Sequence, residues 1–239
     1  MQDGMSVSLT GQVAMEERLT SLANNVANSR TVGFRATQIT FDEVLKSVDD
    51  ERVSMVSKGD EIISSRAGGL ESTGNALDLA ISGDAWFQVQ VDGANVMTRD
   101  GRFKIDNQGA LVTLNGDAVL DAGGAPIQLN AAGGSVDIAG DGVITQNGNV
   151  VGGVGLFSFN PGTNFERYGP SGFRANETTE VLVDQTKAGV MQGYIEQSNV
   201  NPVQEITRLI TVQRGFEQSV ALTEKADQSL QQLIRSFGR

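Results

Sequence analysis

The chain has 239 residues and a net charge of −11 at pH 7, and it contains neither cysteine nor histidine. The acidic balance argues against nucleic-acid binding and against anionic membrane surfaces, because both kinds of partner need clustered cations. The two missing residue types exclude disulfides, thiolate or imidazole metal sites and serine hydrolase triads.

The N-terminal segment is predicted to form a helix over residues 5–28. It has no basic region followed by a continuous apolar stretch, so we expect neither a cleaved Sec-type signal peptide nor a membrane span. A spacing of 3.5 residues predicts that this helix packs against another. The positions that carry this period are Met5, Gln12, Leu19 and Val26, interleaved with Ser8, Met15 and Leu22.

Residues 36–76 are predicted to be a connector. Their charge and weak periodicity fit a short helix followed by an extended segment, or simply a solvated excursion.

The pattern changes to period two from Leu77 onward, which predicts short strands. Asp-Gly and Asn-Gly turn signals follow at intervals of about eight residues, and such pairs supply the positive φ values of hairpin turns. We therefore expect an all-β domain over residues 77–200, as a meander or a barrel-like fold. The turn signals are Asp92-Gly93, Asp100-Gly101, Asn107 to Gly109, Asn115-Gly116, Asp141-Gly142 and Asn147-Gly148.

A second long helix is predicted from Pro202 to Phe237, with Asn201 as its N-cap. Gly215 interrupts it, either to admit another helix closely or because one glycine is simply tolerated. Two heptad positions run along the helix. One comprises Leu209, Phe216, Thr223, Leu230 and Phe237, and the other comprises Ile206, Gln213, Val220, Asp227 and Ile234.

These segments predict a discontinuous α+β fold. Residues 1–35 and 201–239 would pair as a coiled-coil-like helical domain, flanking the connector and the β-rich domain. The polar residues Gln12, Gln213 and Asp227 weaken both stripes, so we expect partly disordered ends in the free monomer.

Motifs for catalysis or ligand binding are weak. Asp137 and Asp141 do not match a calcium loop, because Gly148 stands where its closing Glu would fall. The glycines of residues 152–158 lack the third glycine of a dinucleotide fingerprint. Asn176 begins a formal glycosylation triplet, and no carboxylate pair has a spacing that indicates a glycosidase.

Three asparagines crowd the end of the first predicted helix: Asn24, Asn25 and Asn28. One of them can cap the helix, because asparagine tolerates the left-handed conformation. The others could set register among packed helices without burying a charge, or could belong to an elaborate C-cap and turn. The residues alone leave both interpretations open.

Four stretches in order resemble the flagellar axial proteins, the rod and hook subunits of the bacterial flagellum. They are LANNVANSRTVGFRA, GGLESTGNALDLAISGDAWFQV, TRDGRFKIDNQGALVTLNGDAVL and GYIEQSNVNPVQEITRLITVQRGFE. Ala85-Trp86 departs from the Gly-Phe that the family usually has. The length and the single β-domain are most similar to a proximal-rod subunit, with a distal-rod subunit as the alternative.

The resemblance implies a structural subunit with no enzymatic activity and no cofactor. Such subunits leave the cell through the flagellar type III export apparatus without a cleaved leader. They then assemble helically, with copies of themselves and neighbouring rod subunits, into the basal-body rod that crosses the periplasm. The terminal helices would form the inner tube and the β-domain the outer layer, without nucleic acid or membrane insertion.

The resemblance also suggests which residues meet other subunits. In the first motif these are Leu19, Leu22, Asn24, Asn25, Val26, Asn28, Thr31, Gly33 and Phe34. In the last helix they are Ile206, Leu209, Gln213, Phe216, Val220, Leu230, Ile234 and Phe237. Two other interpretations remain: a rod subunit that also binds an assembly factor through its β-domain, and a secreted β-rich carbohydrate-binding protein. The second is poorly supplied with platform aromatics, which are only Trp86, Tyr168 and Tyr194.

Overall fold

A computed structural model describes residues 2–48, 51–130, 133–160, 162, 165–175, 179–182 and 188–237. The chain divides into two compact units. The helical unit comprises Met1–Ala27, Thr37–Ile62 and Asn201–Arg239, and the β unit comprises Asn28–Ala36 and Ile63–Val200.

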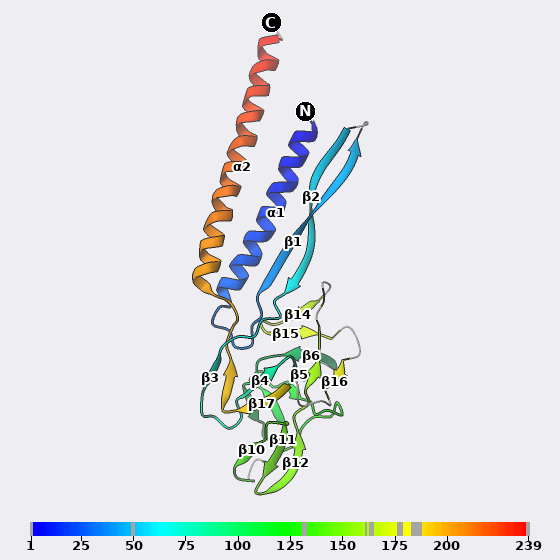
Figure 1. Ribbon diagram of the computed structural model, residues 1–239, viewed down its shortest axis with the longest axis vertical. Helices are drawn as coiled ribbons and strands as arrows, with labels where there is room; N and C mark the ends of the chain where they lie inside the picture. Colours follow the sequence, from blue (N-terminus) through cyan, green and yellow to red (C-terminus); the bar gives the residue numbers. More distant parts are fainter. Residues whose placement is uncertain are drawn as a thin grey trace. The chain divides into compact units, whose positions relative to one another are not determined.

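The helical unit contains α1 (Gln2–Ala27), α2 (Pro202–Phe237) and the strands β1 (Thr37–Val48) and β2 (Glu51–Ile63). The two helices run antiparallel, and β1 lies beside α1 (Figure 1). The predicted cap of α2 is confirmed, because Asn201 Oδ1 accepts hydrogen bonds from the backbone N–H groups of Val203 (3.1 Å) and Gln204 (3.3 Å). No helix in the described part of the chain is long and apolar enough to cross a membrane.

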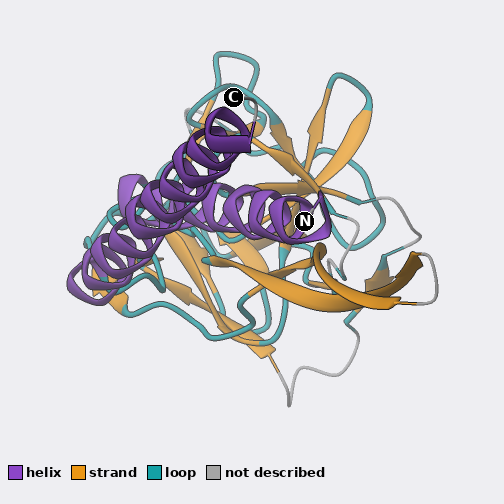
Figure 2. Cartoon of the chain, turned by 90° about the horizontal axis from the view of Figure 1, so that it is seen from above, coloured by secondary structure: helices purple, strands orange, loops and turns teal. Residues whose placement is uncertain are grey.

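The prediction of a short helix in the connector is wrong for its described residues. β1 and β2 instead form a two-stranded sheet, seen as the long curved pair of strands in Figure 2. The β-forming residues Thr37, Ile39 and Phe41 occupy alternate positions at the start of β1. Charged residues further along the segment hide this alternation, so the period-two signal was underestimated.

The β unit is built of short strands in several sheets. The largest sheet has seven strands in the order β14-β15-β6-β5-β9-β8-β7. None of the sheets among the described residues closes into a barrel, so the barrel-like form of our expectation is wrong, while the meander part holds for β7-β8-β9 and for the β5–β6 hairpin. The strands are β3 (Leu70–Ser72), β4 (Leu79–Gly83), β5 (Phe87–Val91), β6 (Ala94–Thr98), β7 (Phe103–Ile105), β8 (Leu111–Thr113), β9 (Ala118–Val119), β10 (Val136–Ile138), β11 (Val143–Gln146), β12 (Asn149–Gly153), β13 (Phe157–Ser158), β14 (Glu166–Tyr168), β15 (Gly172–Arg174), β16 (Glu180–Val181), β17 (Ala188–Gln192) and β18 (Tyr194–Glu196).

Two of the predicted hairpin turns have the expected backbone. Asp92-Gly93 joins β5 to β6, and Asn147-Gly148 joins β11 to β12, with all four residues at positive φ. The backbone of Gly101 does not have a positive φ, and this glycine has a different role. A Cβ there would lie 1.7 Å from the carbonyl oxygen of Leu79, so this glycine permits close contact between two backbone segments.

The core of the β unit has two clusters. The larger one gathers apolar side chains from most strands, including Leu79, Phe87 and Ile144, each with no measurable exposure. The smaller one surrounds the only tryptophan: Trp86 meets the ring of Phe173 edge-on, with centroids 5.5 Å apart. The β unit therefore buries an extensive interior of its own.

Candidate assembly site

Polar side chains pair across the line of contact between α1 and α2. The hydroxyl groups of Ser8 and Thr223 lie 2.9 Å apart, and Gln12 Nε2 donates to Thr223 Oγ1 at 3.1 Å. All three residues stand at heptad positions in the sequence. Of the polar residues that we expected to weaken the stripes, Gln12 therefore has a partner on the other helix, whereas Gln213 donates to Glu217 on its own helix at 3.1 Å.

Only part of the predicted α2 stripe turns toward α1. Leu209, Phe216 and Val220 are half-buried, whereas Ile206 is 45% exposed and Gln213 is exposed. On α1, Leu22 is buried, and Leu19 and Val26 are half-buried. The side chains of Leu230, Ile234 and Phe237 lie outside the described set.

Asn25 holds the start of β1 against α1. Its Nδ2 donates to the carbonyl of Thr37 at 2.9 Å, and its Oδ1 accepts from the backbone N–H of Thr37 at 3.0 Å. The carboxylate of Glu205 on α2 lies 3.4 Å from the same Nδ2. With only 2% of its surface exposed, Asn25 satisfies its hydrogen bonds inside the helical unit.

The other two asparagines of the cluster have different settings. Asn24 is exposed, on the surface of α1. Asn28 belongs to the β unit, where its side-chain oxygen accepts a bond from the Thr31 hydroxyl (3.1 Å) and its carbonyl accepts from Thr31 N–H (3.1 Å). The three asparagines therefore have different roles. Asn25 holds the start of β1, Asn24 lies on the surface of α1, and Asn28 belongs to a turn.

Gly33 and Phe34 follow in a tightly packed part of the β unit. Gly33 has φ +70°, and a Cβ there would lie 2.4 Å from the backbone nitrogen of Asp100. Its own N–H donates to the carbonyl of Glu196 at 2.7 Å. Phe34 is 1% exposed and lies under the guanidinium of Arg167, 4.9 Å from the ring centroid. The motif residues therefore serve packing within this unit.

A buried ion cluster joins three of the four sequence motifs within the β unit. Glu196 Oε1 lies 2.7 Å from Arg35 Nη2, and Glu196 Oε2 lies 3.1 Å from Arg99 Nη1. All three side chains are 1% exposed. Glu196 Oε1 also accepts from the backbone N–H of Gly68 at 2.9 Å. One carboxylate thus neutralises part of the charge of two guanidinium groups.

Burial governs the electrostatics of the two arginines. It lowers the pKa of Arg99 from its ordinary value to about 10, against the opposing effect of Glu196 and together with the repulsion from Arg35. Burial likewise lowers the pKa of Arg35, again opposed by Glu196. Both guanidinium carbons lie over Trp86, at 5.1 Å for Arg99 and 5.9 Å for Arg35. Both arginines therefore stay charged at neutral pH, and each guanidinium group lies between the carboxylate of Glu196 and the ring of Trp86.

Asn199 fixes the neighbouring segments of the β unit. Its Oδ1 accepts from the backbone N–H of Ala36 at 2.8 Å, and its Nδ2 donates to the carbonyl of Arg66 at 2.7 Å. Sequence reasoning left Asn199, Arg35, Arg99 and Glu196 out of the candidate set. Their position inside the resemblance motifs was the available signal, but nothing in the spacing showed that they would meet.

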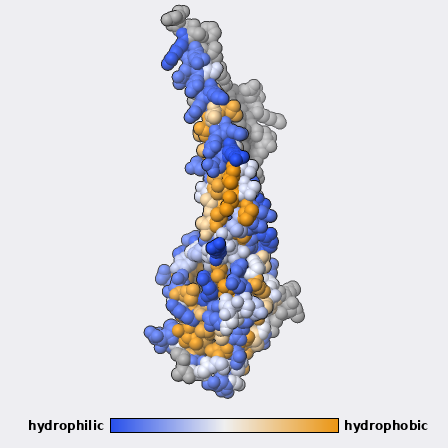
Figure 3. Space-filling model, turned by 90° about the vertical axis from the view of Figure 1, so that its left-hand side faces the viewer, coloured by the Kyte–Doolittle hydropathy of each residue, from blue (hydrophilic) through white to orange (hydrophobic). Residues whose placement is uncertain are grey.

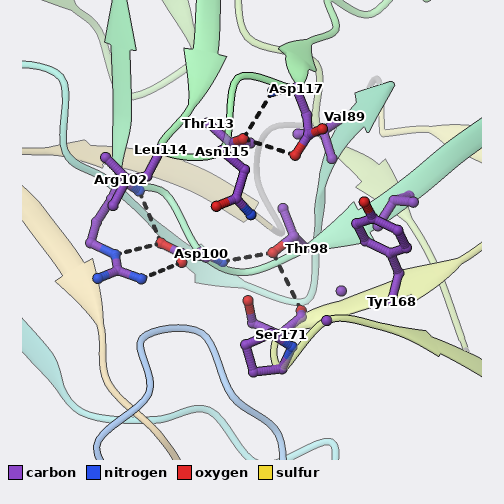
Figure 4. A pocket seen from close by; sticks show the side chains of 14 residues that line it. Val89, Thr98, Asp100, Arg102, Thr113, Leu114, Asn115, Asp117, Tyr168 and Ser171 are labelled. Carbon is purple, nitrogen blue, oxygen red and sulfur yellow. Dashed lines mark hydrogen bonds and ion pairs between the residues drawn. The ribbon is translucent and has the colours of Figure 1, made fainter. Parts of the chain in front are cut away.

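The β unit also carries a polar pocket of about 280 Å³, shown in Figure 4. Asp100 accepts two bonds from the guanidinium of Arg102, at 2.9 Å and 2.6 Å, and these bonds raise the pKa of Arg102. Thr98 donates to the carbonyl of Ser171 at 3.3 Å. Asp100 and Arg102 therefore form an ion pair within the pocket, and Asp117 accepts a hydrogen bond from the Thr113 hydroxyl at 3.0 Å. No cluster of metal-ligating residues occurs among the described residues.

The motifs that we considered for calcium and dinucleotide binding lie in turns and strands of the β unit. Asp141 accepts a bond from the backbone N–H of Val143 at 3.0 Å, which closes a turn. Residues 152–158 span the end of β12 and all of β13, without the helix that a dinucleotide site requires. Asn176 lies outside the described residues.

Large apolar side chains remain exposed on both helices. On α1 these are Leu9 (60% exposed) and Val13 (49%). On α2 they include Val203 (72%), Ile206 (45%) and Ile210 (44%). Figure 3 shows apolar surface along the helices on the face that it presents. Such contiguous exposed apolar surface is typical of an interaction site.

Two family models match the chain. The model of the flagellar basal body rod FlgEFG protein C-terminal region matches residues 191–236, and the model of the flagellar hook protein FlgE/F/G D1 domain matches residues 80–146. The flagellar basal-body rod protein FlgF of Mesorhizobium japonicum is 46% identical over 100% of this chain and 99% of its own length. FlgF of Rhizobium meliloti gives the same values. The rod protein FlgG of Bacillus subtilis is 29% identical over 95% of this chain and 96% of its own length.

Proposed function

This chain belongs to the flagellar basal-body rod protein family, and on that premise we propose that it polymerises helically into the proximal rod, the part of the drive shaft that transmits torque. The observation that carries the proposal is its 46% identity, over its whole length, with proteins named FlgF. The comparisons give no support to a carbohydrate-binding protein or to a distal-rod subunit. The family's structural role also implies a protein that is not an enzyme.

The helical unit supplies the physical reason to assemble. Among the residues of this unit whose side chains the structure describes, only Ala14 and Leu22 are hydrophobic and buried, while several larger hydrophobic side chains on the same helices are exposed. Two helices with so small a shared interior gain most of their stability from further packing. Pairing of the terminal helices as a coiled coil within a multi-copy inner tube, with the β unit as the outer layer, would provide it.

The proposal extends to the route and the partners. The chain would be exported through the flagellar type III apparatus without a cleaved leader and would join copies of itself and neighbouring rod subunits in the periplasm. The exposed members of the expected interface set, Asn24, Ile206 and Gln213, would contact those subunits directly. Asn25, Gly33 and Phe34 would contribute by fixing the shape of each unit, because they are buried.

Deletion of the gene, followed by electron microscopy of isolated basal bodies, tests this function. We expect non-motile cells whose basal bodies stop at a shortened rod, and full recovery when the wild-type chain is supplied. Complete rods and normal swimming in the deletion strain would contradict a role as a rod subunit.

A further inference from the structure

The sequence has two asparagine–glycine pairs, and both lie in exposed turns of the β unit. Asn115-Gly116 lies in the loop between β8 and β9, and Asn147-Gly148 forms the turn between β11 and β12. In such a pair the side-chain amide can be attacked by the backbone nitrogen of the next residue, and glycine has no Cβ to hinder the approach. Both pairs are therefore candidate sites of chemical modification.

The reaction needs only the chain and water. The glycine nitrogen bonds to Cγ of the asparagine, the Cγ–Nδ2 bond breaks, and ammonia leaves with the proton that the glycine nitrogen loses. The product is a five-membered succinimide ring. Water then opens the ring at one of its two carbonyl groups, which gives aspartate or isoaspartate. Asparagine is counted among the thermolabile residues.

The first turn holds its attacking nitrogen in a hydrogen bond. The N–H of Gly116 donates to the carbonyl of Thr113 at 3.0 Å, and the N–H of Thr113 donates to the carbonyl of Asp117 at 2.8 Å. The Thr113 hydroxyl also donates to the Asp117 carboxylate at 3.0 Å, close to the side chain of Asn115 (Figure 4). Before Asn115 can react, the N–H of Gly116 must therefore break its hydrogen bond and the loop must open.

The second turn leaves its attacking nitrogen free. The N–H of Gly148 and the carboxamide of Asn147 make no hydrogen bond to any residue that the structure describes. The φ values of 51° and 77° are those of a type I′ turn, in which the flanking residues, here Gln146 and Asn149, make the hydrogen bonds. A Cβ at Gly148 would meet nothing within 4 Å, so the space around this residue is open.

The strand that follows the second turn lies at the edge of its sheet. β12 pairs with β11 alone in the three-stranded sheet, so local opening of this turn disrupts few contacts. We propose that Asn147 is a site of spontaneous deamidation and that it reacts faster than Asn115 in the folded chain.

The modification changes the chemistry of its surroundings. No charged residue occurs between Asp141 and Glu166, and deamidation places a carboxylate within that stretch. Isoaspartate also adds one methylene group to the backbone of a two-residue turn. Because turn length fixes the register of a hairpin, this change disturbs the pairing of Gln146 with Asn149.

The test incubates the purified full chain at mildly alkaline pH, where the attacking nitrogen loses its proton more readily. Digestion before Asp106, Asp117 and Asp141 then places the two asparagines in different peptides, whose deamidation is followed by mass spectrometry. We expect Asn147 to react about fivefold faster than Asn115, because the nitrogen that attacks Asn115 must first lose a hydrogen bond. Equal rates, a faster reaction at Asn115 or an unreacted Asn147 would overturn the proposal.

Two controls separate the fold from the local sequence. In concentrated urea both pairs lose their turns, so we expect the two rates to agree within about twofold. A difference that persists in urea would overturn the argument from the folded turns. Asn147→Gln should abolish the mass gain of its peptide, since glutamine must close a larger ring, and should leave Asn115 unchanged. A mass gain that persists in this variant would place the reaction at another residue and overturn the assignment to Asn147.

Discussion

The β unit and the helical unit differ in how much of their apolar surface they bury within themselves. The β unit buries an extensive apolar core and hides two arginine charges around Glu196. The helical unit leaves Val203, Ile206 and Ile210 in contact with solvent. The β unit has an apolar interior of its own, whereas the helical unit has few buried apolar side chains and gains most from neighbours. Burial of apolar side chains is thus concentrated in one unit of the chain, and exposed apolar side chains are available for assembly on the helices of the other.

The largest loss of stability is expected when the carboxylate of Glu196, at the centre of the ion cluster in the β unit, is removed. Glu196→Gln leaves Arg35 and Arg99 buried without a counter-charge, and breaking a buried ion cluster in this way costs about 3–5 kcal/mol. The free energy of unfolding, followed in urea by the fluorescence of the single tryptophan, measures this loss. Trp86 reports directly because both guanidinium groups lie over its ring.

Asp84→Asn is the matched control for that variant. Asp84 lies 3.8 Å from Arg99, but its side chain is 92% exposed. Solvent screens such a pair, so we expect a change below about 0.5 kcal/mol. Equal losses for the two variants would show that the buried cluster contributes no more than a surface charge.

A smaller loss is expected from Gly33→Ala in the same unit. Alanine is strained at the φ of +70° of this residue. Its Cβ would also lie 2.4 Å from the backbone nitrogen of Asp100, so the backbone must shift. We expect a cost of about 2–3 kcal/mol. Gly74→Ala has nearly the same φ, +71°, with nothing within 4 Å of its Cβ, so it should cost only about 1 kcal/mol. Indistinguishable urea midpoints would contradict the close contact at Gly33.

In the helical unit, Asn25→Ala should loosen the start of β1. It removes the side-chain acceptor of the buried Thr37 N–H and one of the two side-chain donors to the Thr37 carbonyl, the other being the Ser21 hydroxyl, which costs about 1–3 kcal/mol. Faster amide hydrogen exchange at Thr37 would record the loss. Asn24→Ala, at an exposed neighbouring position, should leave that exchange unchanged, and an equal effect of both variants would refute the assignment of the anchor to Asn25.

The smallest expected effect is that of pH between 6 and 9. The chain has no histidine or cysteine, so no ordinary side chain titrates there. The pKa of Arg99, lowered to about 10 in the folded state, means that the unfolded state binds more protons than the folded state from about pH 10 upward, until the unfolded guanidinium also loses its proton. Stability would rise with pH in that window and stay flat between pH 6 and pH 9. Thermal midpoints that differ by more than a few degrees between pH 6 and pH 9 would contradict this.

Local signals made much of the fold predictable from sequence. The cap at Asn201 and the turns at Asp92-Gly93 and Asn147-Gly148 depend on neighbouring residues alone. The β1–β2 pair was missed because charged residues obscured its alternation. The barrel-like expectation failed because strand patterns do not determine whether a sheet closes.

The candidate site was less predictable, since it depends on contacts distant in sequence. The asparagine cluster was visible, but only coordinates show that Asn25 bonds to Thr37 while Asn24 faces solvent. The ion cluster joins residues up to 161 positions apart in the sequence, namely Arg35, Arg99 and Glu196. A periodic pattern in the sequence does not predict contacts over that separation. Gly215 drew notice in the sequence, yet its open surroundings emerge only from the packed helices.

The central claim, that the helical unit is completed by neighbouring subunits while the β unit stands alone, is tested most directly by hydrogen exchange on the free chain and on assembled rods. We predict that amides of α1 and α2 exchange quickly in the dilute chain and become protected in the rod, whereas core strands such as β5 are protected in both. Helices as strongly protected in the free chain as β5 would contradict it.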